Sequence, residues 1–119
     1  MAKILLIDDE PDVIEFQKRF LERRKYEVST ASNIPQAIEA FRKESPEIVF
    51  CDIRLETDTA GFDILEQAKK IKPDSVIYLV TGLTDKDIEE KGIALGAKEI
   101  LVKPLTNVIL EQKVKEQIG

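Results

Sequence analysis

The stretch EIVFCDIRLE, residues 47–56, joins a run of apolar residues directly to a carboxylate. Residues 48–51 are all apolar, and a short run of this kind is typical of a strand that is buried on both faces. An unpaired charge at the end of a buried strand is costly, so Asp52 must either be solvated at the tip of the strand or be held there by cations. Asp52 is therefore the first candidate functional residue.

The length and composition predict one globular domain over residues 1–119. A chain of 119 residues is long enough to bury a core but too short for two domains. Hydrophobic residues make up 43% of the chain, which favours a folded domain over a disordered one. The first ten residues, MAKILLIDDE, contain two aspartates and match neither a signal peptide nor a membrane span. We therefore expect a cytoplasmic protein with no membrane partner.

Several kinds of chemistry are excluded by the residue types that are missing. The chain has no histidine and a single cysteine, so it lacks the ligands of a zinc site and the base of histidine-dependent catalysis. Any metal must then be bound by oxygen. Cys51 lies inside an apolar run, where we expect a buried structural thiol. The net charge of −5 argues against direct nucleic-acid binding by this domain.

Apolar runs alternate with amphipathic segments along the chain. The runs predict strands at 4–7, 26–30, 48–51, 76–80 and 99–102; the second alternates like an edge strand, and the others are typical of strands buried on both faces. Apolar residues at three- and four-residue spacing predict helices at 11–24, 34–44, 62–71, 85–95 and 106–117. This order predicts an α/β fold, with a doubly wound parallel sheet of five strands between five helices.

The helical segments carry further signals. Asp85 and Thr106 are placed to cap the fourth and fifth helices. Gly92 lies inside the fourth helix and costs about 1 kcal/mol relative to alanine, so we expect that helix to be marginal. Ile14 lies off the apolar stripe of the first helix, and we expect it to be exposed. The stripe that we expect to face the core consists of Val13, Phe16, Phe20 and Leu21.

Polar residues follow four of the predicted strands. In a doubly wound sheet, ligands bind beyond the carboxyl ends of the strands, so these residues should converge on one edge. Each has a simpler role when taken alone, because aspartates cap helices, threonine is common in strands and surface lysines are solvated. Their convergence favours a functional site made of Asp8, Asp9, Asp52, Thr81 and Lys103.

These residue types are suited to phosphoryl transfer. Three neighbouring carboxylates raise one another's pKa unless a cation joins them, and Mg²⁺ is the hard, oxygen-seeking ion that fits best. Lys103 and Thr81 could bind the oxygens of a transferring phosphoryl group. Asp52 is then placed to attack phosphorus, because a carboxylate can carry a phosphoryl group covalently.

Four short motifs are shared with a known family. Through them the chain resembles the response-regulator receiver domain of two-component signalling over essentially its whole length. The motifs are DDE at 8–10, CDIRL at 51–55, VTG at 80–82 and GAKEILVKP at 96–104. The resemblance implies the CheY-like, flavodoxin-like strand order 2-1-3-4-5. It also implies a signalling phosphoacceptor domain that is not an enzyme in the usual sense, since it catalyses only its own phosphorylation and dephosphorylation.

The resemblance assigns a role to each residue of the site. Asp52 is implied to be the phosphoacceptor. It would receive the phosphoryl group from a sensor histidine kinase or a histidine phosphotransfer protein. Asp9 and Asp52 are implied to bind Mg²⁺ directly with the backbone carbonyl of Arg54, and Asp8 to act on the ion through water. Thr81 and Lys103 are implied to contact the phosphoryl group. The peptide between Lys103 and Pro104 is implied to be cis.

The chain departs from the family pattern at two places. The second switch residue, which acts with Thr81, is usually aromatic, whereas here it is Ile100. The resemblance implies output to a downstream effector or a fused output domain through the face of the fourth helix, fifth strand and fifth helix, which is also a candidate dimer interface. After Asp52, Glu56 stands where proline is common and Gly61 comes one residue late, so we expect a more mobile loop.

Three alternatives remain from the sequence. A receiver-like interaction module that is not phosphorylated is compatible with Ile100. A Mg²⁺-dependent phosphatase of the haloacid-dehalogenase type would need a second aspartate where Arg54 stands. A flavin carrier is suggested by TGLT at 81–84 but disfavoured by the acidic site and the absence of tryptophan. Because the chain ends at KEQIG, we expect no output domain within it, and either a stand-alone regulator or an excised domain.

Overall fold

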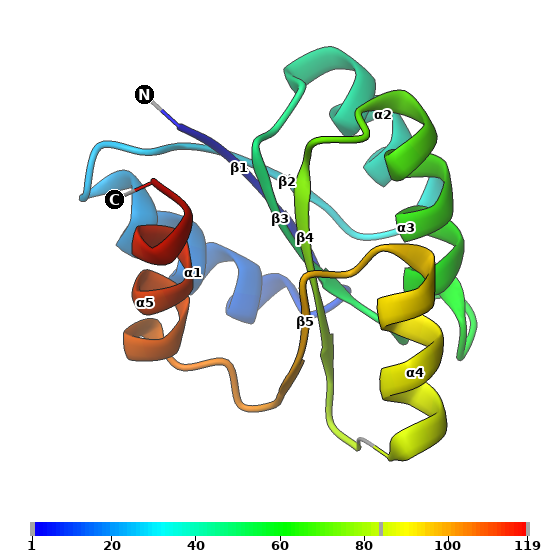
Figure 1. The fold of residues 1–119 in the computed structure, drawn as a ribbon. Coiled ribbons are helices and arrows are strands. Elements are labelled where there is room, and N and C mark those ends of the chain that lie inside the picture. Colours follow the sequence, from blue (N-terminus) through cyan, green and yellow to red (C-terminus); the bar gives the residue numbers. More distant parts are fainter. Residues whose placement is uncertain (1, 84, 119) are drawn as a thin grey trace.

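The fold is an alternation of five parallel strands with five helices, in a computed structural model that describes residues 2–83 and 85–118 (Figure 1). The strand order is β2-β1-β3-β4-β5, as predicted. The elements in chain order are β1 (Lys3–Ile7), α1 (Pro11–Glu22), β2 (Glu27–Ala31), α2 (Ile34–Glu44), β3 (Ile48–Asp52), α3 (Ala60–Ile71), β4 (Val76–Thr81), α4 (Lys86–Leu95), β5 (Glu99–Val102) and α5 (Asn107–Ile118).

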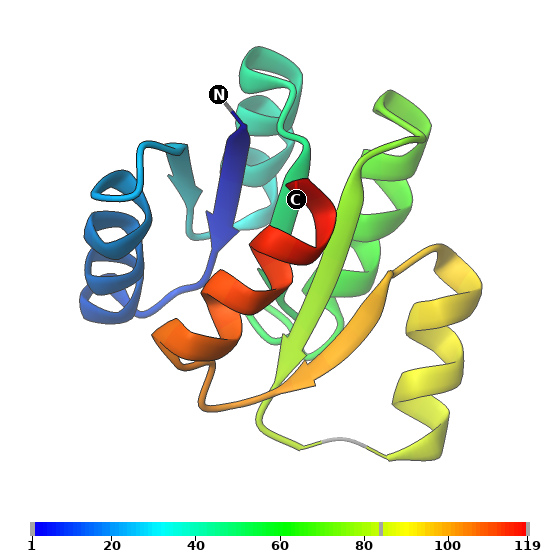
Figure 2. The same cartoon turned by 60° about the vertical axis from the view of Figure 1, so that its left-hand side comes forward.

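The helices form a layer on each face of the sheet. Helices α1 and α5 cover one face, and α2, α3 and α4 cover the other, as Figures 1 and 2 show from two directions. This arrangement follows from crossovers of one hand, which wind in opposite directions from the middle of the sheet. None of the helices in the described part of the chain is long and apolar enough to cross a membrane.

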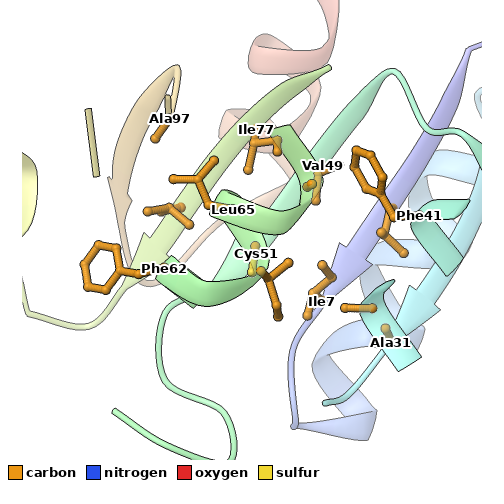
Figure 3. Packing of buried hydrophobic residues seen from close by; sticks show 14 of the residues in the cluster. Ile7, Ala31, Phe41, Val49, Cys51, Phe62, Leu65, Ile77 and Ala97 are labelled. Carbon is orange, nitrogen blue, oxygen red and sulfur yellow. The ribbon is translucent and has the colours of Figure 1, made fainter. Parts of the chain in front are cut away.

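The central strand β3 is buried along its whole length, as its sequence predicts. Its alternate residues belong to two separate hydrophobic clusters, because successive side chains of a strand point to opposite faces. Val49 and Cys51 pack beneath α2 and α3 with Phe41 and Leu65 (Figure 3). On the other face, Phe50 stacks on Tyr78 of β4 with ring centroids 5.1 Å apart. Cys51 is therefore a structural thiol, and burial raises its pKa.

Both predicted helix caps are present. The carboxylate of Asp85 accepts a hydrogen bond from the Ile88 backbone N–H at 2.9 Å, so α4 begins one residue later than the sequence predicts. The hydroxyl of Thr106 accepts one from the Ile109 N–H at 3.3 Å at the start of α5. Each cap satisfies a backbone N–H group that the first turn of a helix leaves without an intrahelical partner.

The prediction that β5 is buried on both faces is wrong. Strand β5 pairs only with β4 and lies at the edge of the sheet, and Glu99 and Val102 are exposed. The run of three apolar residues at 100–102 matches a buried strand, but an edge strand also keeps apolar residues where a helix covers one face. Only Leu101 is fully buried in this strand.

The predicted core face of α1 is also wrong in part. Phe16 is 66% exposed, whereas Gln17 and Leu21 are the buried residues of the helix. The side-chain amide of Gln17 reaches the backbone carbonyl of Leu105 at 3.5 Å, so the buried polar group faces a polar partner. Ile14, expected to be exposed, is half-buried. The helix is thus rotated away from the orientation that its apolar stripe predicts.

Two glycines allow helices to approach the sheet closely. A Cβ atom at Gly61, in the first turn of α3, would lie 2.6 Å from Ile53 Cα and 2.7 Å from the backbone oxygen of Asp52. A Cβ atom at Gly92 would lie 2.5 Å from the Cδ1 methyl of Ile100. Gly92 therefore makes room for Ile100 beneath α4, which the helix-propensity argument from sequence did not predict.

We expect Gly61→Ala to destabilise the fold by about 2–3 kcal/mol, because the new methyl group meets backbone atoms that cannot rotate away. Urea unfolding measures the difference. Gly82→Ala is the matched control, since no atom lies within 4 Å of a Cβ atom at that position, and its stability should differ little from that of the wild type. Equal stability of the two variants would contradict this account of Gly61.

Candidate functional site

The strand register brings the carboxylates of Asp8 and Asp52 to neighbouring positions. Ile7 is the partner of Cys51 in the β1–β3 pair, so the residue after each of them lies at the same end of the sheet. The Asp8 N–H donates to the Ala31 carbonyl at 3.1 Å, which extends the β1–β2 ladder by one residue. Asp8 and Asp52 are both buried, and the regular strands beneath them fix their positions.

Lys103 provides the positive charge of the site. Its ammonium donates to Asp52 Oδ2 at 2.8 Å and lies 4.0 Å from Asp8 Oδ2. The backbone N–H of Lys103 donates to the Thr81 carbonyl at 2.8 Å, which fixes the start of the loop after β5. The cis peptide between Lys103 and Pro104 is present, as the family resemblance implied.

A group of three acids follows β1. Ligand oxygens of Asp8, Asp9 and Glu10 all lie within 4.8 Å of one another, close enough for one metal ion. Glu10 was not among the predicted site residues, although the third letter of the DDE motif could have suggested it. Its backbone N–H donates to Asp8 Oδ1 at 3.0 Å, so the turn that carries the acids also orients Asp8.

Burial sets the protonation behaviour of the two central carboxylates. Desolvation raises the pKa of Asp52, and it outweighs the hydrogen bond and charge of Lys103, which act in the opposite direction. Desolvation likewise raises the pKa of Asp8, with the charge of Asp52 adding to the effect. For Lys103 burial disfavours the charged form, but the nearby carboxylates prevail and raise the pKa of its ammonium. A bound cation would relieve the unfavourable burial of both aspartates.

The Thr81 hydroxyl is engaged away from the carboxylates. It donates to the Leu83 carbonyl at 2.8 Å and accepts from the Leu83 N–H at 3.3 Å. Val80 belongs to the cluster under α1 and α5, so Thr81, the next residue of β4, points toward the opposite face of the sheet. Thr84, the last residue of the TGLT motif, lies outside the described residues.

Ile100 is half-buried and packs against the cluster beneath α4. Its Cδ1 methyl packs against Gly92, where a Cβ atom would leave no room for it. Ile100 therefore links β5 directly to α4. An isoleucine therefore fills this part of the structure, where the family usually has an aromatic ring. The role of Ile100 as a switch stays a prediction.

The loop after Asp52 divides into an inner and an outer part. The Arg54 backbone N–H donates to Asp52 Oδ1 at 3.4 Å, whereas the Arg54 side chain extends into solvent and pairs with Asp58 at 3.3 Å. The side chain of Leu55 packs against the core cluster. The loop is thus attached to the fold near its start. The sequence predicted a more mobile loop and did not predict these attachments.

A cavity of about 720 Å³ adjoins the carboxylates on the side of α1 and α5. Asp8, Asp52 and Lys103 contribute to its lining, together with apolar side chains from α1 and from the loop after β5. The exposed Phe16 belongs to this apolar part. Its side chain thus lies at the cavity and not in the core, where the apolar stripe of α1 predicted it. The site therefore opens beside an apolar surface.

The chain belongs to the response regulator receiver domain family, whose model matches residues 4–115. The receiver domain protein (CheY-like) of Methanospirillum hungatei superposes with a TM-score of 0.91 at 28% identity, over 99% of this chain and 94% of that one. A receiver domain protein of Clostridium thermocellum superposes with a TM-score of 0.88 at 34% identity, over 99% and 94%. The fold and family are those of a signalling module of two-component response regulators.

The curated relatives are longer proteins that regulate transcription. The alkaline phosphatase synthesis transcriptional regulatory protein PhoP of Bacillus subtilis is 31% identical over 95% of this chain and 47% of its own length. The alginate biosynthesis transcriptional regulatory protein AlgB of Pseudomonas aeruginosa is 34% identical over 87% of this chain and 23% of its own length. The chain spans about half the length, or less, of these relatives.

We expect Asp8→Asn to raise the melting temperature at pH 7 in Mg²⁺-free buffer by a few degrees. The folded chain binds the proton of Asp8 more tightly than the unfolded chain, because the pKa is raised on folding. The charged form therefore destabilises the fold at neutral pH, and this effect disappears as the pH falls through the folded pKa.

Calorimetric scans from pH 7 down to pH 3 measure the difference between the variant and the wild type, which should shrink towards the acid end. Asp9→Asn serves as the control, because the Asp9 side chain is exposed and its replacement should change the melting temperature little. A lower melting temperature of Asp8→Asn at pH 7 would show that burial does not dominate at this carboxylate.

Proposed function

We propose that this receiver domain accepts a phosphoryl group on Asp52 from a phosphorylated histidine of a sensor kinase or a phosphotransfer protein. The proposal rests chiefly on one observation, the 2.8 Å contact between Asp52 Oδ2 and the Lys103 ammonium at the tip of a fully buried strand. A carboxylate held rigidly beside a cation and a second buried acid is suited to attack phosphorus. The site residues otherwise match the family motifs at Asp8, Asp9 and Thr81.

The residues that would hold Mg²⁺ are Asp9, Asp52 and the backbone carbonyl of Arg54, with Asp8 acting through water. The grouping of acids at 8–10 and the raised pKa values of Asp8 and Asp52 support such a site, since both indicate carboxylates that a cation would stabilise. When bound, the ion supplies positive charge against the oxygens of the transferring phosphoryl group. Glu10 adds a further carboxylate at the edge of the group.

In the proposed reaction a carboxylate oxygen of Asp52 forms a bond to phosphorus. The bond between phosphorus and the imidazole nitrogen of the donor breaks, and its electron pair stays on that nitrogen, so no oxidant or further reactant is needed. Lys103 binds an oxygen of the phosphoryl group while it remains near the carboxylate. The reaction modifies only the receiver itself. In dephosphorylation the oxygen of a water molecule bonds to phosphorus and the bond between phosphorus and the Asp52 oxygen breaks, so that inorganic phosphate leaves and the Asp52 carboxylate is restored.

Phosphorylation would be transmitted through Thr81 and Ile100. The hydroxyl of Thr81 must leave Leu83 to bond the phosphoryl group, which would shift the loop between β4 and α4. Ile100 would follow by repacking against Gly92. We propose that the surface of α4, β5 and α5 carries the output, to a downstream effector or a fused output domain or through a dimer. Exposed apolar residues on this surface include Ile93, Val102 and Val108.

We further propose that the donor protein docks over α1 and the loop after β5. The apolar part of the cavity beside Asp52 lies there, with Phe16 exposed at its rim. A phosphohistidine seated against this surface would face the phosphoacceptor. The exposure of a large aromatic side chain supports a protein contact, because such residues often anchor interfaces.

The test of the phosphoacceptor is mass spectrometry after incubation with acetyl phosphate and Mg²⁺. Wild type should acquire one phosphoryl group, and Asp52→Asn should acquire none, because its amide cannot form the acyl phosphate. Removal of Mg²⁺ with EDTA should abolish the adduct on wild type. If wild type stays unmodified with both this donor and a histidine-phosphorylated protein, the chain is an interaction module that is not phosphorylated.

We expect Phe16→Ala to lower the phosphotransfer rate from a histidine-phosphorylated protein about tenfold or more, because it removes an exposed aromatic anchor. The rate with acetyl phosphate should stay unchanged, since the small donor needs no docking surface. Ile93→Ala, on α4, is a control for loss of an exposed apolar side chain and should leave both rates unchanged. An equal loss with both donors would place Phe16 in the reaction itself and contradict the docking surface.

A further inference from the structure

Glu56 makes a contact that the family pattern does not predict. Its Oε1 atom accepts a hydrogen bond from the backbone N–H of Ile34, the first residue of α2, at 2.5 Å. We propose that Glu56 is a positioning residue for the cation site, holding the loop that carries the Arg54 carbonyl. The inference rests on the proposed function, because it concerns the Mg²⁺ that phosphorylation would require.

The start of α2 suits a carboxylate partner. The first backbone N–H groups of a helix lack intrahelical acceptors, and the helix dipole favours a negative charge at this end. Asn33 caps the Gln36 N–H at 2.9 Å, which leaves the Ile34 N–H for an acceptor from elsewhere in the fold. Glu56 supplies it from a loop 22 residues further along the chain, with an ionised oxygen, which makes a stronger acceptor than a neutral one.

The loop after β3 has attachments on both sides of Glu56. Before it, the side chain of Leu55 packs on the core cluster. After it, the Gly61 N–H donates to the Ile53 carbonyl at 2.9 Å, where α3 meets the end of β3. Glu56 joins the stretch between these points to α2. Arg54 lies two residues before Glu56, so the contact limits the positions that its carbonyl can take.

The same contact connects the two acid-bearing segments of the site. The Ala31 carbonyl, at the end of β2, accepts from the Asp8 N–H at 3.1 Å. Only two residues separate Ala31 from Ile34, which binds Glu56. The segment 31–34 is therefore hydrogen-bonded to the turn that begins at Asp8 and to the loop that follows Asp52. Mg²⁺ would bind between these two segments, and a fixed spacing lowers the ordering cost of binding.

The experiment compares Glu56→Ala, Glu56→Gln and Asp58→Ala with wild type. Amide hydrogen exchange of Ile34, followed by NMR without metal, reports the contact itself. Titration with Mg²⁺ alone, followed by NMR, reports the dissociation constant without any phosphoryl donor. Asp58→Ala is the matched control, because it removes the same charge from the same loop, where the exposed Asp58 carboxylate pairs with the exposed side chain of Arg54 at 3.3 Å.

We expect Glu56→Ala to speed exchange at Ile34 about tenfold and to weaken Mg²⁺ binding about threefold, which are sizes typical of losing one hydrogen bond to a charged group in an exposed setting. Glu56→Gln keeps an acceptor and should recover most of both effects. Asp58→Ala should leave exchange at Ile34 unchanged and alter Mg²⁺ binding less than Glu56→Ala does.

Two results would overturn the inference alone. If wild type binds Mg²⁺ and Glu56→Ala binds it with the same dissociation constant, the contact does not position the site. Equal weakening in Glu56→Ala and Asp58→Ala would assign the effect to loop charge. If wild type binds no Mg²⁺ at all, the proposed function fails in its metal requirement and the inference fails with it, so the two failures are distinguishable.

Discussion

The ion pair between Asp52 and Lys103 is the interaction on which the site depends. Asp52 is 5% exposed at the end of a strand that is otherwise apolar, so its charge needs a partner within the fold. Lys103 is 51 residues away in sequence, and β4 lies between β3, which ends at Asp52, and β5, which directly precedes Lys103. The pair can form only when β3, β4 and β5 are assembled in this order. The chemistry of the site is therefore a consequence of the sheet.

The site also depends on close packing around the carboxyl ends of the strands. Helix α3 begins against the backbone of Asp52, where only glycine fits at position 61. Helix α4 lies on Ile100 through Gly92. These two contacts fix both the proposed phosphoacceptor and the candidate switch residue to neighbouring helices. A shift at either helix would be felt at the site, because packed interiors have little free volume to absorb it.

Much of the fold could be predicted from local patterns. All five strands and five helices occur close to their predicted places, and Asp85 and Thr106 cap the helices that they were expected to cap. The strand order came from the family resemblance rather than from periodicity. Patterns failed where burial depends on distant neighbours: Phe16 matches a core stripe but lies at a cavity rim, and β5 has apolar residues but lies at an edge.

The sequence by itself determined which chemistry is available, because residue types alone exclude zinc sites and histidine-dependent catalysis and leave carboxylates, a hydroxyl and an ammonium after the strands. Only the tertiary structure decided how these groups meet. It joined Lys103 to Asp52, turned the Thr81 hydroxyl toward Leu83 and brought Glu56 to the start of α2. Such contacts depend on strand register and helix placement, which are set by packing over the whole chain rather than by neighbouring residues.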